Sequence, residues 1–354
     1  MSDALALPQA ELASYLETHV AGFRGPFNAT KFKGGQSNPT YLLEAASGRY
    51  VLRRKPPGKL LASAHAVDRE FRVLRALTGQ ELAGTLRAGE ALAYSAVPVA
   101  QPLHLCTDNA VIGSMFYVMQ YVPGRSLCDP ALPELTSAAR AAHYAAALDA
   151  LVALAQLDVA AAGLTDYAKP GNYFARQVSR WSEQYRAAET EPIEAMETLI
   201  AWLPGALPAD DGRVALVHGD FRIDNLIWDA QAPRLAAIVD WELSTLGHPH
   251  ADLAYFCMAL RLPRNPVLPG LAGVDRAVLG IPDETAMIDR FAAASGLDPR
   301  PHWPFLLAFQ FFRLAAIAQG VLKRALQGNA SSERAMQAGA MTRSIAELGV
   351  AAAR

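Results

Sequence analysis

Two short segments place carboxylate and amide side chains directly after apolar runs. They are residues 217–225, VHGDFRIDN, and residues 238–242, IVDWE, and they contain Asp220, Asn225 and Asp240. Carboxylate and amide oxygens are ligands that Mg2+ accepts, and Mg2+ fills its remaining positions with water or substrate phosphates. A carboxylate within hydrogen-bonding distance of a hydroxyl group can also orient it or accept its proton. The residue types therefore indicate chemistry between a phosphate group and a hydroxyl group.

The spacing of these side chains narrows the chemistry to phosphoryl transfer. In the protein-kinase signature, a catalytic Asp is followed five residues later by a metal-binding Asn, and a second metal-binding Asp comes later in the chain. Asp220, Asn225 and Asp240 repeat this order and spacing. We therefore predict that Asp220 is catalytic and that Asn225 and Asp240 bind Mg2+. Phosphoryl transfer needs positioning and charge neutralisation more than covalent help, and these residues can supply both.

The neighbouring polar residues receive structural or open assignments. An HGD tripeptide can be an ordinary turn and Asp240 a simple strand end, but the combined order, spacing and strand context favours a functional site. His218 is expected to brace the loop backbone. Asp224 and Glu242 could reach a second metal, a substrate group or solvent, and their roles stay open.

Apolar runs predict the strands that hold these residues. Residues 214–217 and 226–228 have the composition of short buried strands on either side of the loop, and residues 235–239 form a third that ends at Asp240.

A glycine-containing turn precedes the first candidate nucleotide contacts. Residues 33–38, KGGQSN, lie between two strand-like segments. Gly34, Gly35 and Ser37 are the predicted phosphate contacts, because glycines let backbone N–H groups approach phosphate oxygens. The same composition is also typical of an ordinary hairpin turn.

The next strand, residues 50–53, ends in a cation where the V-A-I-K pattern has its phosphate-binding Lys. Arg53 is therefore the predicted phosphate anchor, and Arg54 falls on the opposite strand face. Apolar residues at helical spacing predict a helix over 68–77. Glu70 on this helix is expected to pair with Arg53; without such a partner it would be a solvated helix charge.

An apolar strand over residues 115–122 runs into Pro123 and Gly124, which indicate a turn. A hinge between two lobes is expected here. The backbone groups of Gln120, Tyr121 and Val122 would then hydrogen-bond an adenine ring, although such apolar strands are also common in plain core.

These segments together carry a family resemblance. From about residue 30 to residue 319 the chain resembles the aminoglycoside phosphotransferase and choline kinase superfamily, whose fold is protein-kinase-like. Residues 34–41, GGQSNPTY, and 51–61, VLRRKPPGKLL, with 65–71, HAVDREF, are more particular. They are similar to the phosphotransferase domain at the N-terminus of some acyl-CoA dehydrogenases and to its stand-alone bacterial relatives.

The resemblance implies an α+β, bilobal protein-kinase-like fold with a small antiparallel-sheet N-lobe and a large, mostly helical C-lobe. Residues 1–122 would form an N-terminal helix, over 8–20, and the nucleotide-binding lobe. Residues 123–354 would carry the catalytic loop and the acceptor site. The implied cofactors are ATP and Mg2+, and the implied reaction is phosphorylation of a hydroxyl group of a small molecule. Asp252 is implied to open a helix and to support the catalytic loop.

Departures from the protein-kinase pattern argue against a protein substrate. The phosphate anchor is Arg53 in place of Lys, which keeps the charge and changes its geometry. Residues 240–242 read DWE where protein kinases have DFG, and no Ala-Pro-Glu follows. Neither element of a regulated activation loop is therefore present in its usual form.

The identity of the acceptor stays open at this point. The basic residues Arg53, Arg54, Lys55 and Lys59 favour an anionic or phosphate-bearing acceptor. The resemblance to domains fused to acyl-CoA dehydrogenases implies a hydroxyacyl-CoA or a related hydroxy acid derivative. Alternatives are an aminoglycoside, amino alcohol or sugar, or a catalytically silent nucleotide-binding module. The acidic residues 189–197 could suit a polycation, but a solvated helix face is expected there.

Composition agrees with a globular protein of two lobes. The chain has 354 residues, of which 52% are hydrophobic and 19% charged. A net charge of −2 gives no general basis for binding nucleic acid or an anionic membrane, so neither is expected as a partner. The three cysteines are far apart in sequence and no secretory signal is visible, which favours a reducing cytoplasm. Residues 305–322 are apolar but interrupted by polar residues, so a buried helix is expected. Oligomeric state is not readable from the sequence.

A proline-rich segment lies late in the chain. Residues 263–269, followed by Gly270, predict a loop that could cap the acceptor site.

Overall fold

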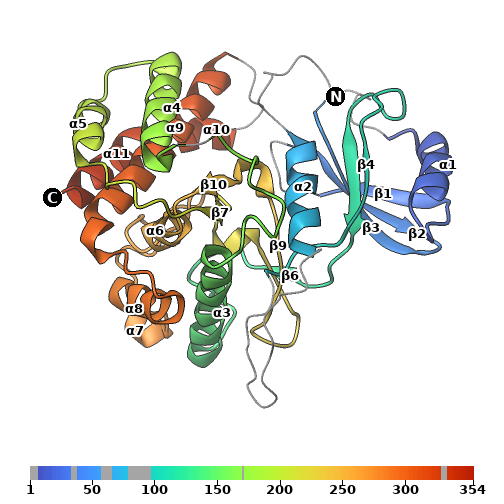
Figure 1. The fold of residues 1–354 in the computed structure, drawn as a ribbon, viewed down its shortest axis with the longest axis horizontal. Helices are drawn as coiled ribbons and strands as arrows, with labels where there is room; N and C mark the ends of the chain where they lie inside the picture. The colour runs from blue at the N-terminus through green and yellow to red at the C-terminus, as the bar shows by residue number, and fades with distance from the viewer. Residues whose placement is uncertain (1–6, 33–37, 57–65, 79–96, 170, 328–332) are drawn as a thin grey trace. The chain divides into compact units, whose positions relative to one another are not determined.

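The computed structural model describes residues 7–32, 38–56, 66–78, 97–169, 171–327 and 333–354 (Figure 1). The chain divides into two compact units. Unit 1 comprises Met1–Arg125, Ala160–Leu164 and Leu226–Ser244, and unit 2 comprises Ser126–Val159, Thr165–Asn225 and Thr245–Arg354. The predicted glycine contacts Gly34, Gly35 and Ser37, together with Lys59, lie outside the described residues.

Unit 1 is organised around a five-stranded antiparallel sheet in the order β1-β2-β3-β5-β4. Side chains alternate along each strand, so Tyr41 and Leu43 of β2 enter the core while Glu44 faces solvent. Leu12 and Leu16 of α1 belong to the same apolar core. The bounds are α1 (Gln9–His19), β1 (Phe27–Lys31), β2 (Thr40–Ala45), β3 (Gly48–Arg54), α2 (Val67–Thr78), β4 (Pro102–Cys106) and β5 (Phe116–Gln120).

Unit 1 also contains a later hairpin that carries Asp240. Strand β8 (Leu226–Trp228) pairs with β9 (Leu235–Ile238) in antiparallel register. The hairpin belongs to this unit because Ile238 N–H donates to the carbonyl of Pro98 at 2.8 Å, and because the short 3-10 helix η4 (Trp241–Leu243) packs against α2. Whereas the expected division put everything after residue 122 in one lobe, Asp240 therefore groups with the N-terminal sheet and not with Asp220.

Unit 2 is mostly helical and carries a short two-stranded antiparallel sheet, in which β7 pairs with β10. Its central helix is α9, which packs against α4, α5, α6, α10 and α11. The bounds are β6 (Arg125–Ser126) at the passage between the units, then α3 (Ser137–Ala155), α4 (Tyr173–Ala188), α5 (Glu194–Trp202), η2 (Leu203–Ala206), β7 (Ala215–Val217), η3 (Ile223–Asn225), β10 (Thr245–Gly247), α6 (His250–Met258), α7 (Arg276–Leu279), α8 (Glu284–Ser295), η5 (Arg300–His302), α9 (Trp303–Leu326), α10 (Glu333–Ala340) and α11 (Thr342–Ala352).

Helix α9 is long and apolar enough to cross a membrane by length and composition alone. In the structure, 78% of its most apolar window is buried, and its neighbours are the other helices of unit 2. This burial agrees with the expectation that residues 305–322 form a core helix. Together, the small antiparallel sheet of unit 1 and the helices of unit 2 confirm the predicted α+β class.

Candidate functional site

The loop that carries Asp220 follows a strand that is completely buried. Strand β7 ends at Val217, which lies opposite Thr245 of β10. Gly219 has a φ of 84°, a left-handed conformation that side chains disfavour, so the turn between His218 and Asp220 requires glycine there. The HGD tripeptide is therefore a turn by geometry, and this turn projects Asp220 beyond the strand end.

The loop backbone is fixed by side chains from two helices of unit 2. Asp252, in the first turn of α6, accepts hydrogen bonds from the N–H groups of His218 at 2.6 Å and Gly219 at 2.9 Å. Arg313 of α9 donates to the carbonyl of Gly219. His218 Nδ1 accepts from the N–H of Asp220 at 3.2 Å. These contacts match the supporting roles expected of His218 and Asp252.

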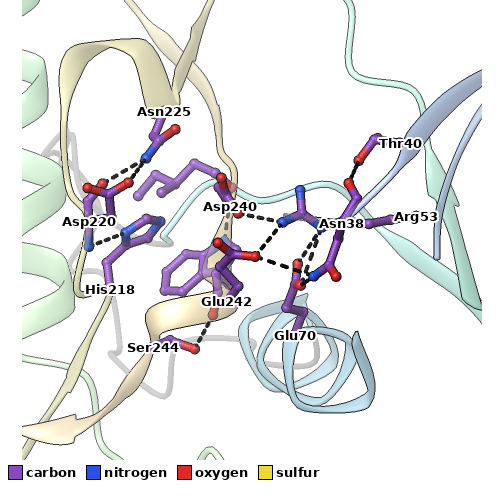
Figure 2. Close-up of polar contacts among 12 residues, drawn as sticks. Asn38, Thr40, Arg53, Glu70, His218, Asp220, Asn225, Asp240, Glu242 and Ser244 are labelled. Carbon is purple, nitrogen blue, oxygen red and sulfur yellow. Dashed lines mark hydrogen bonds and ion pairs between the residues drawn. The ribbon is translucent and has the colours of Figure 1, made fainter. Parts of the chain in front are cut away.

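Asp220 and Asn225 lie together (Figure 2), and both oxygens of the Asp220 carboxylate accept hydrogen bonds. Asn225 Nδ2 donates to Asp220 Oδ2 at 3.0 Å and to the Asp220 carbonyl at 2.8 Å. The hydroxyl of Tyr255 donates to Oδ1 at 2.6 Å, and Arg222 Nε lies 3.3 Å from the same oxygen. Among the residues that the structure describes, none donates to the amide oxygen of Asn225. This oxygen is therefore suited to a metal ion.

The environment of Asp220 keeps it ionised. Burial favours the neutral carboxyl group, but the charge of Arg222 and the hydrogen bond from Tyr255 outweigh it, so the pKa of Asp220 lies below its ordinary value. An ionised carboxylate readily accepts a hydrogen bond from a hydroxyl group, although it is only a weak base. Asp220 can therefore orient a hydroxyl group throughout the neutral pH range.

Tyr255 is a site residue that the sequence analysis missed. It lies on α6 three positions after Asp252, so both side chains are on one helix face and both reach the Asp220 loop. Burial raises the pKa of Tyr255 far above its usual range, so its hydroxyl stays protonated and donates to Asp220. The three-residue spacing from Asp252 is the signal that could have identified it.

A second group of polar side chains lies in unit 1, around Arg53 (Figure 2). Arg53 Nε is 3.0 Å from Glu70 Oε2, which confirms the predicted ion pair. Arg53 Nη2 is 2.5 Å from Asp240 Oδ1 and 3.4 Å from Glu242 Oε2. Glu70 is buried and also accepts from Asn38 Nδ2 at 2.8 Å and from the Tyr117 hydroxyl at 3.2 Å. The structure thus brings three predicted site residues together, at positions 53, 70 and 240.

Asp240 adopts a backbone conformation that is costly for a residue with a side chain. Its φ is 68° and its ψ 60°, in the left-handed region. The turn after it is held by Trp241 Nε1, which donates to the Ile238 carbonyl at 3.0 Å, and by Ser244 Oγ, which donates to the Trp241 carbonyl. Strain that is maintained by surrounding contacts is common at functional sites. Here the conformation brings the Asp240 carboxylate to Arg53.

The charges around Arg53 do not balance. One guanidinium faces the carboxylates of Glu70, Asp240 and Glu242. Burial, together with the charges of Asp240 and Glu242, raises the pKa of Glu70 to about 7 in spite of Arg53. A divalent cation would offset this excess of negative charge, so the donor set fits Mg2+ bound at Asp240. No cluster of three or more His, Cys, Asp or Glu side chains suited to a metal occurs in the described parts of the chain, so ligands other than these side chains would have to complete the coordination.

The basic residues expected to attract an anionic acceptor are engaged otherwise. Arg54 is buried, with Nε donating to Ser114 Oγ at 2.9 Å and Nη2 donating to the Ile112 carbonyl at 2.8 Å. Arg53 faces the three carboxylates. The prediction that the basic run as a whole serves the acceptor is therefore wrong for Arg53 and Arg54. The reason is that both guanidiniums satisfy partners inside unit 1.

The predicted hinge residues lie at the end of β5. The N–H of Gln120 donates to the Gln101 carbonyl at 2.8 Å, and the N–H of Tyr121 donates to the Arg49 carbonyl at 3.4 Å. The Arg49 guanidinium stacks on the Tyr121 ring, 4.2 Å from its centroid. Of the three predicted hinge residues, Val122 is thus the one whose N–H has no acceptor within the described structure.

The structure also places the two residues whose roles the sequence left open. Asp224 pairs with Arg222 at 3.0 Å, and Glu242 lies beside Arg53.

Comparison with known proteins finds relatives over nearly the whole chain. The sequence profile of the phosphotransferase enzyme family matches residues 28–276. Acyl-CoA dehydrogenase family member 10 of Mus musculus is 46% identical over 349 residues, which are 97% of this chain and 31% of the mouse protein. Probable acyl-CoA dehydrogenase IBR3 of Arabidopsis thaliana is 43% identical over 358 residues, 95% of this chain and 41% of the plant protein. The chain thus spans less than half the length of these curated relatives.

Solved structures share the fold. A crystal structure from Ralstonia eutropha, provisionally described as an aminoglycoside phosphotransferase, is 42% identical, with a TM-score of 0.83 and 97% of each chain covered. The apo form of a thermostable mutant of aminoglycoside phosphotransferase APH(4)-Ia is 13% identical, with a TM-score of 0.61 over 97% of this chain and 98% of that chain. These likenesses confirm the predicted resemblance to aminoglycoside phosphotransferases and their kinase-like fold.

The buried position of Glu70 leads to a stability prediction. Replacing Glu70 by Ala leaves Arg53, Asn38 and Tyr117 without their shared acceptor, which should lower the free energy of unfolding by about 2–4 kcal/mol. Replacing the exposed Glu44 of β2 by Ala is the matched control and should change it by less than about 0.5 kcal/mol. Urea unfolding measures both. Equal stability of the two variants would contradict the role assigned to Glu70.

Proposed function

Because the chain belongs to the phosphotransferase enzyme family, we propose that it transfers the γ-phosphoryl group of ATP to a hydroxyl group of a small molecule in the presence of Mg2+. The observation that supports this most directly is Asp220, whose carboxylate is ionised and held through both oxygens by Asn225 and Tyr255. Such a carboxylate can accept a hydrogen bond from the acceptor hydroxyl group without a change in its own position.

The reaction has a simple balance of bonds. The acceptor oxygen forms a bond to the γ-phosphorus, the bond between that phosphorus and the β–γ bridging oxygen breaks, and ADP leaves. The hydroxyl proton leaves the acceptor oxygen in the same step and passes by way of the Asp220 carboxylate to solvent. Asp220 orients the hydroxyl group and accepts its hydrogen bond as the acceptor oxygen becomes bonded to phosphorus.

Each remaining site residue receives a role in this proposal. Arg53 contacts the phosphates through Nη1, which bonds no described residue, while Glu70 fixes the guanidinium through Nε. Asn225 and Asp240 would hold Mg2+, which when bound neutralises charge on the phosphates. The backbone of the glycine turn at Gly34, Gly35 and Ser37 would approach the phosphates, and the hinge backbone at Gln120, Tyr121 and Val122 would contact adenine.

Neighbours of the same fold support the choice of a nucleotide. A thermostable mutant of APH(4)-Ia has been solved as a ternary complex with AMP-PNP and hygromycin B, at 14% identity and a TM-score of 0.59. Another mutant of that protein has been solved with ADP and hygromycin B. We propose ATP as the nucleotide of this chain by analogy with these complexes.

The proposed acceptor is a hydroxyacyl-CoA or a related hydroxy acid derivative. The relatives that match nearly all of the chain are named for chemistry on acyl-CoA esters. The alternative is an aminoglycoside, amino alcohol or sugar, and viomycin phosphotransferase of Streptomyces vinaceus, 32% identical over 151 residues, favours it. A catalytically silent nucleotide-binding module is disfavoured, because Asp220 is present at the expected catalytic position and its carboxylate is hydrogen-bonded by Asn225.

The cellular setting remains part of the proposal. Cys106, Cys128 and Cys257 are all free thiols, which suits the cytoplasm expected from the sequence.

An acceptor screen tests the function. We expect magnesium-dependent ADP release with 3- or 4-hydroxyacyl-CoA esters that exceeds the release with kanamycin, choline or glucose. The measurement is coupled ADP formation, with mass spectrometry of the phosphorylated ester. Turnover of an aminoglycoside alone would select the alternative acceptor, and nucleotide binding without turnover on any acceptor would favour the silent module.

Two substitutions separate the proposed roles of the carboxylates. Asp220→Ala should lower kcat by about 10^2–10^4 while ATP affinity is retained, because Asp220 acts on the acceptor hydroxyl. Asp240→Ala should weaken magnesium-dependent ATP binding itself. Asp68→Ala, at an exposed aspartate of α2, is the control and should leave both quantities unchanged. Calorimetric titration with AMP-PNP and steady-state kinetics measure them; parental activity in Asp220→Ala would contradict the assignment.

The hydrogen bond from Tyr255 predicts a change in pH dependence. It lowers the pKa of Asp220, so Tyr255→Phe should raise that pKa. Because the ionised form is active, activity is lost as pH falls through this pKa, and the acidic limb of the variant should therefore lie at higher pH. Above that limb, kcat should fall by no more than about tenfold, since one hydrogen bond of about 1 kcal/mol is removed. An unchanged acidic limb would show that Tyr255 does not tune Asp220.

A further inference from the structure

A small cavity in unit 2 adjoins the residues that follow Asp220. We propose that it receives an apolar part of the acceptor molecule, next to the hydroxyl group that is phosphorylated. This inference rests on the proposed function and adds the chemical character of the acceptor.

The walls of the cavity are mostly apolar. Its volume is about 50 Å3, and it is lined by side chains from the Asp220 loop, from α3, from α6 and the turn that follows it, and from the proline-rich loop. Representative lining residues are Phe221, Ile223, Phe256, Leu260, Leu268 and Leu271. The exposed thiol of Cys128 also lies on its wall. Hydrocarbon enters such surroundings favourably because apolar surface of both the ligand and the wall is removed from water.

The charges at the cavity do not suit a polycation. Its two charged lining residues, Arg222 and Asp224, pair with each other at 3.0 Å. Asp129, beside the lining residues Cys128 and Pro130, is held by both terminal nitrogens of Arg264 at 2.6 and 2.7 Å. An ammonium-rich acceptor would need carboxylates that are not already neutralised by arginine. An uncharged apolar group needs none.

The proline-rich loop forms a fixed wall of this cavity. Leu271 N–H donates to the Ala259 carbonyl at 2.8 Å, and Ala272 N–H donates to the Leu262 carbonyl at 2.9 Å. Gly270 is packed so closely that an added Cβ would lie 2.0 Å from the Leu262 carbonyl oxygen. Arg264 joins the other side of the loop to Asp129. The loop therefore presents Leu268 and Leu271 to the cavity in one arrangement.

Tyr255 connects the cavity to the reacting group. Its side chain lines the cavity, and its hydroxyl bonds Asp220 Oδ1 at 2.6 Å. A hydroxyl group oriented by Asp220 would thus be carried on a carbon whose neighbours face Tyr255, Phe221 and the loop. This arrangement selects acceptors in which an apolar chain adjoins the hydroxyl group.

Equilibrium binding of acyl chains that cannot be phosphorylated tests the cavity apart from catalysis. Calorimetry on the full chain with CoA, butyryl-CoA and octanoyl-CoA, in the presence of AMP-PNP and Mg2+, gives three affinities. Each methylene that enters the cavity should tighten binding about fourfold, from about 0.8 kcal/mol per methylene, until the space is full. Octanoyl-CoA should therefore bind at least tenfold more tightly than CoA.

Leu268→Trp fills the cavity and should reduce the advantage of octanoyl-CoA over CoA by at least fivefold, with CoA affinity unchanged. Leu268→Ala enlarges the cavity and should extend the gain to longer acyl chains. Val278→Trp, at a side chain of unit 2 that is 72% exposed, is the matched control and should alter neither affinity. Circular dichroism verifies folding, and the alanine variant gives the answer if the tryptophan variant does not fold.

The outcomes distinguish this inference from the proposed function. Affinity that is independent of acyl length, or equal length dependence in all three variants, would overturn the cavity assignment even where hydroxyacyl-CoA turnover is observed. Failure of every CoA ester to bind, together with binding of 1-octanol that Leu268→Trp weakens and Val278→Trp does not, would support the cavity and reject the CoA ester as acceptor. Preferred binding of kanamycin over 1-octanol would overturn the apolar character.

Discussion

The backbone of the catalytic loop depends on the buried side chain of Asp252. A loop that leaves a buried strand must bond its N–H groups, because unpaired buried amides cost about 1–3 kcal/mol each. Asp252 accepts from the consecutive N–H groups of His218 and Gly219, and Arg313 donates to the Gly219 carbonyl that follows them. With the backbone held in this way, the side chain of Asp220 is oriented by Asn225, Tyr255 and Arg222. The chemistry proposed for Asp220 follows from this rigidity.

The second constraint is electrostatic and lies in unit 1. Arg53 is surrounded by three carboxylates. One of them belongs to Asp240, whose backbone is in a strained left-handed conformation. A charged side chain that is buried loses its hydration, and this costs much free energy unless an opposite charge lies close to it. The remaining negative charge gives this cluster an affinity for cations that its protein partners do not satisfy. This excess of negative charge is the feature that the proposed Mg2+ at Asp240 would offset.

Much of the site could be predicted because its signals are local in sequence. The spacing of Asp220 and Asn225 identified the loop, and the cation at the end of β3 with an acid on α2 identified the pair of Arg53 and Glu70. Contacts between distant segments could not be predicted from one sequence. Tyr255 was missed because its neighbours on α6 are apolar, and Arg54 was misassigned because its partners, Ser114 and Ile112, lie about sixty positions away.

The distribution of thiols has a practical consequence for experiments on the proposed acceptor site. Cys106 and Cys257 are buried, whereas Cys128 is exposed at the cavity wall. A maleimide dye would therefore attach at a single position in the native protein without any engineered residue. Its fluorescence would report when molecules enter the space beside it, so small-molecule libraries could be surveyed by a spectroscopic signal that requires no turnover.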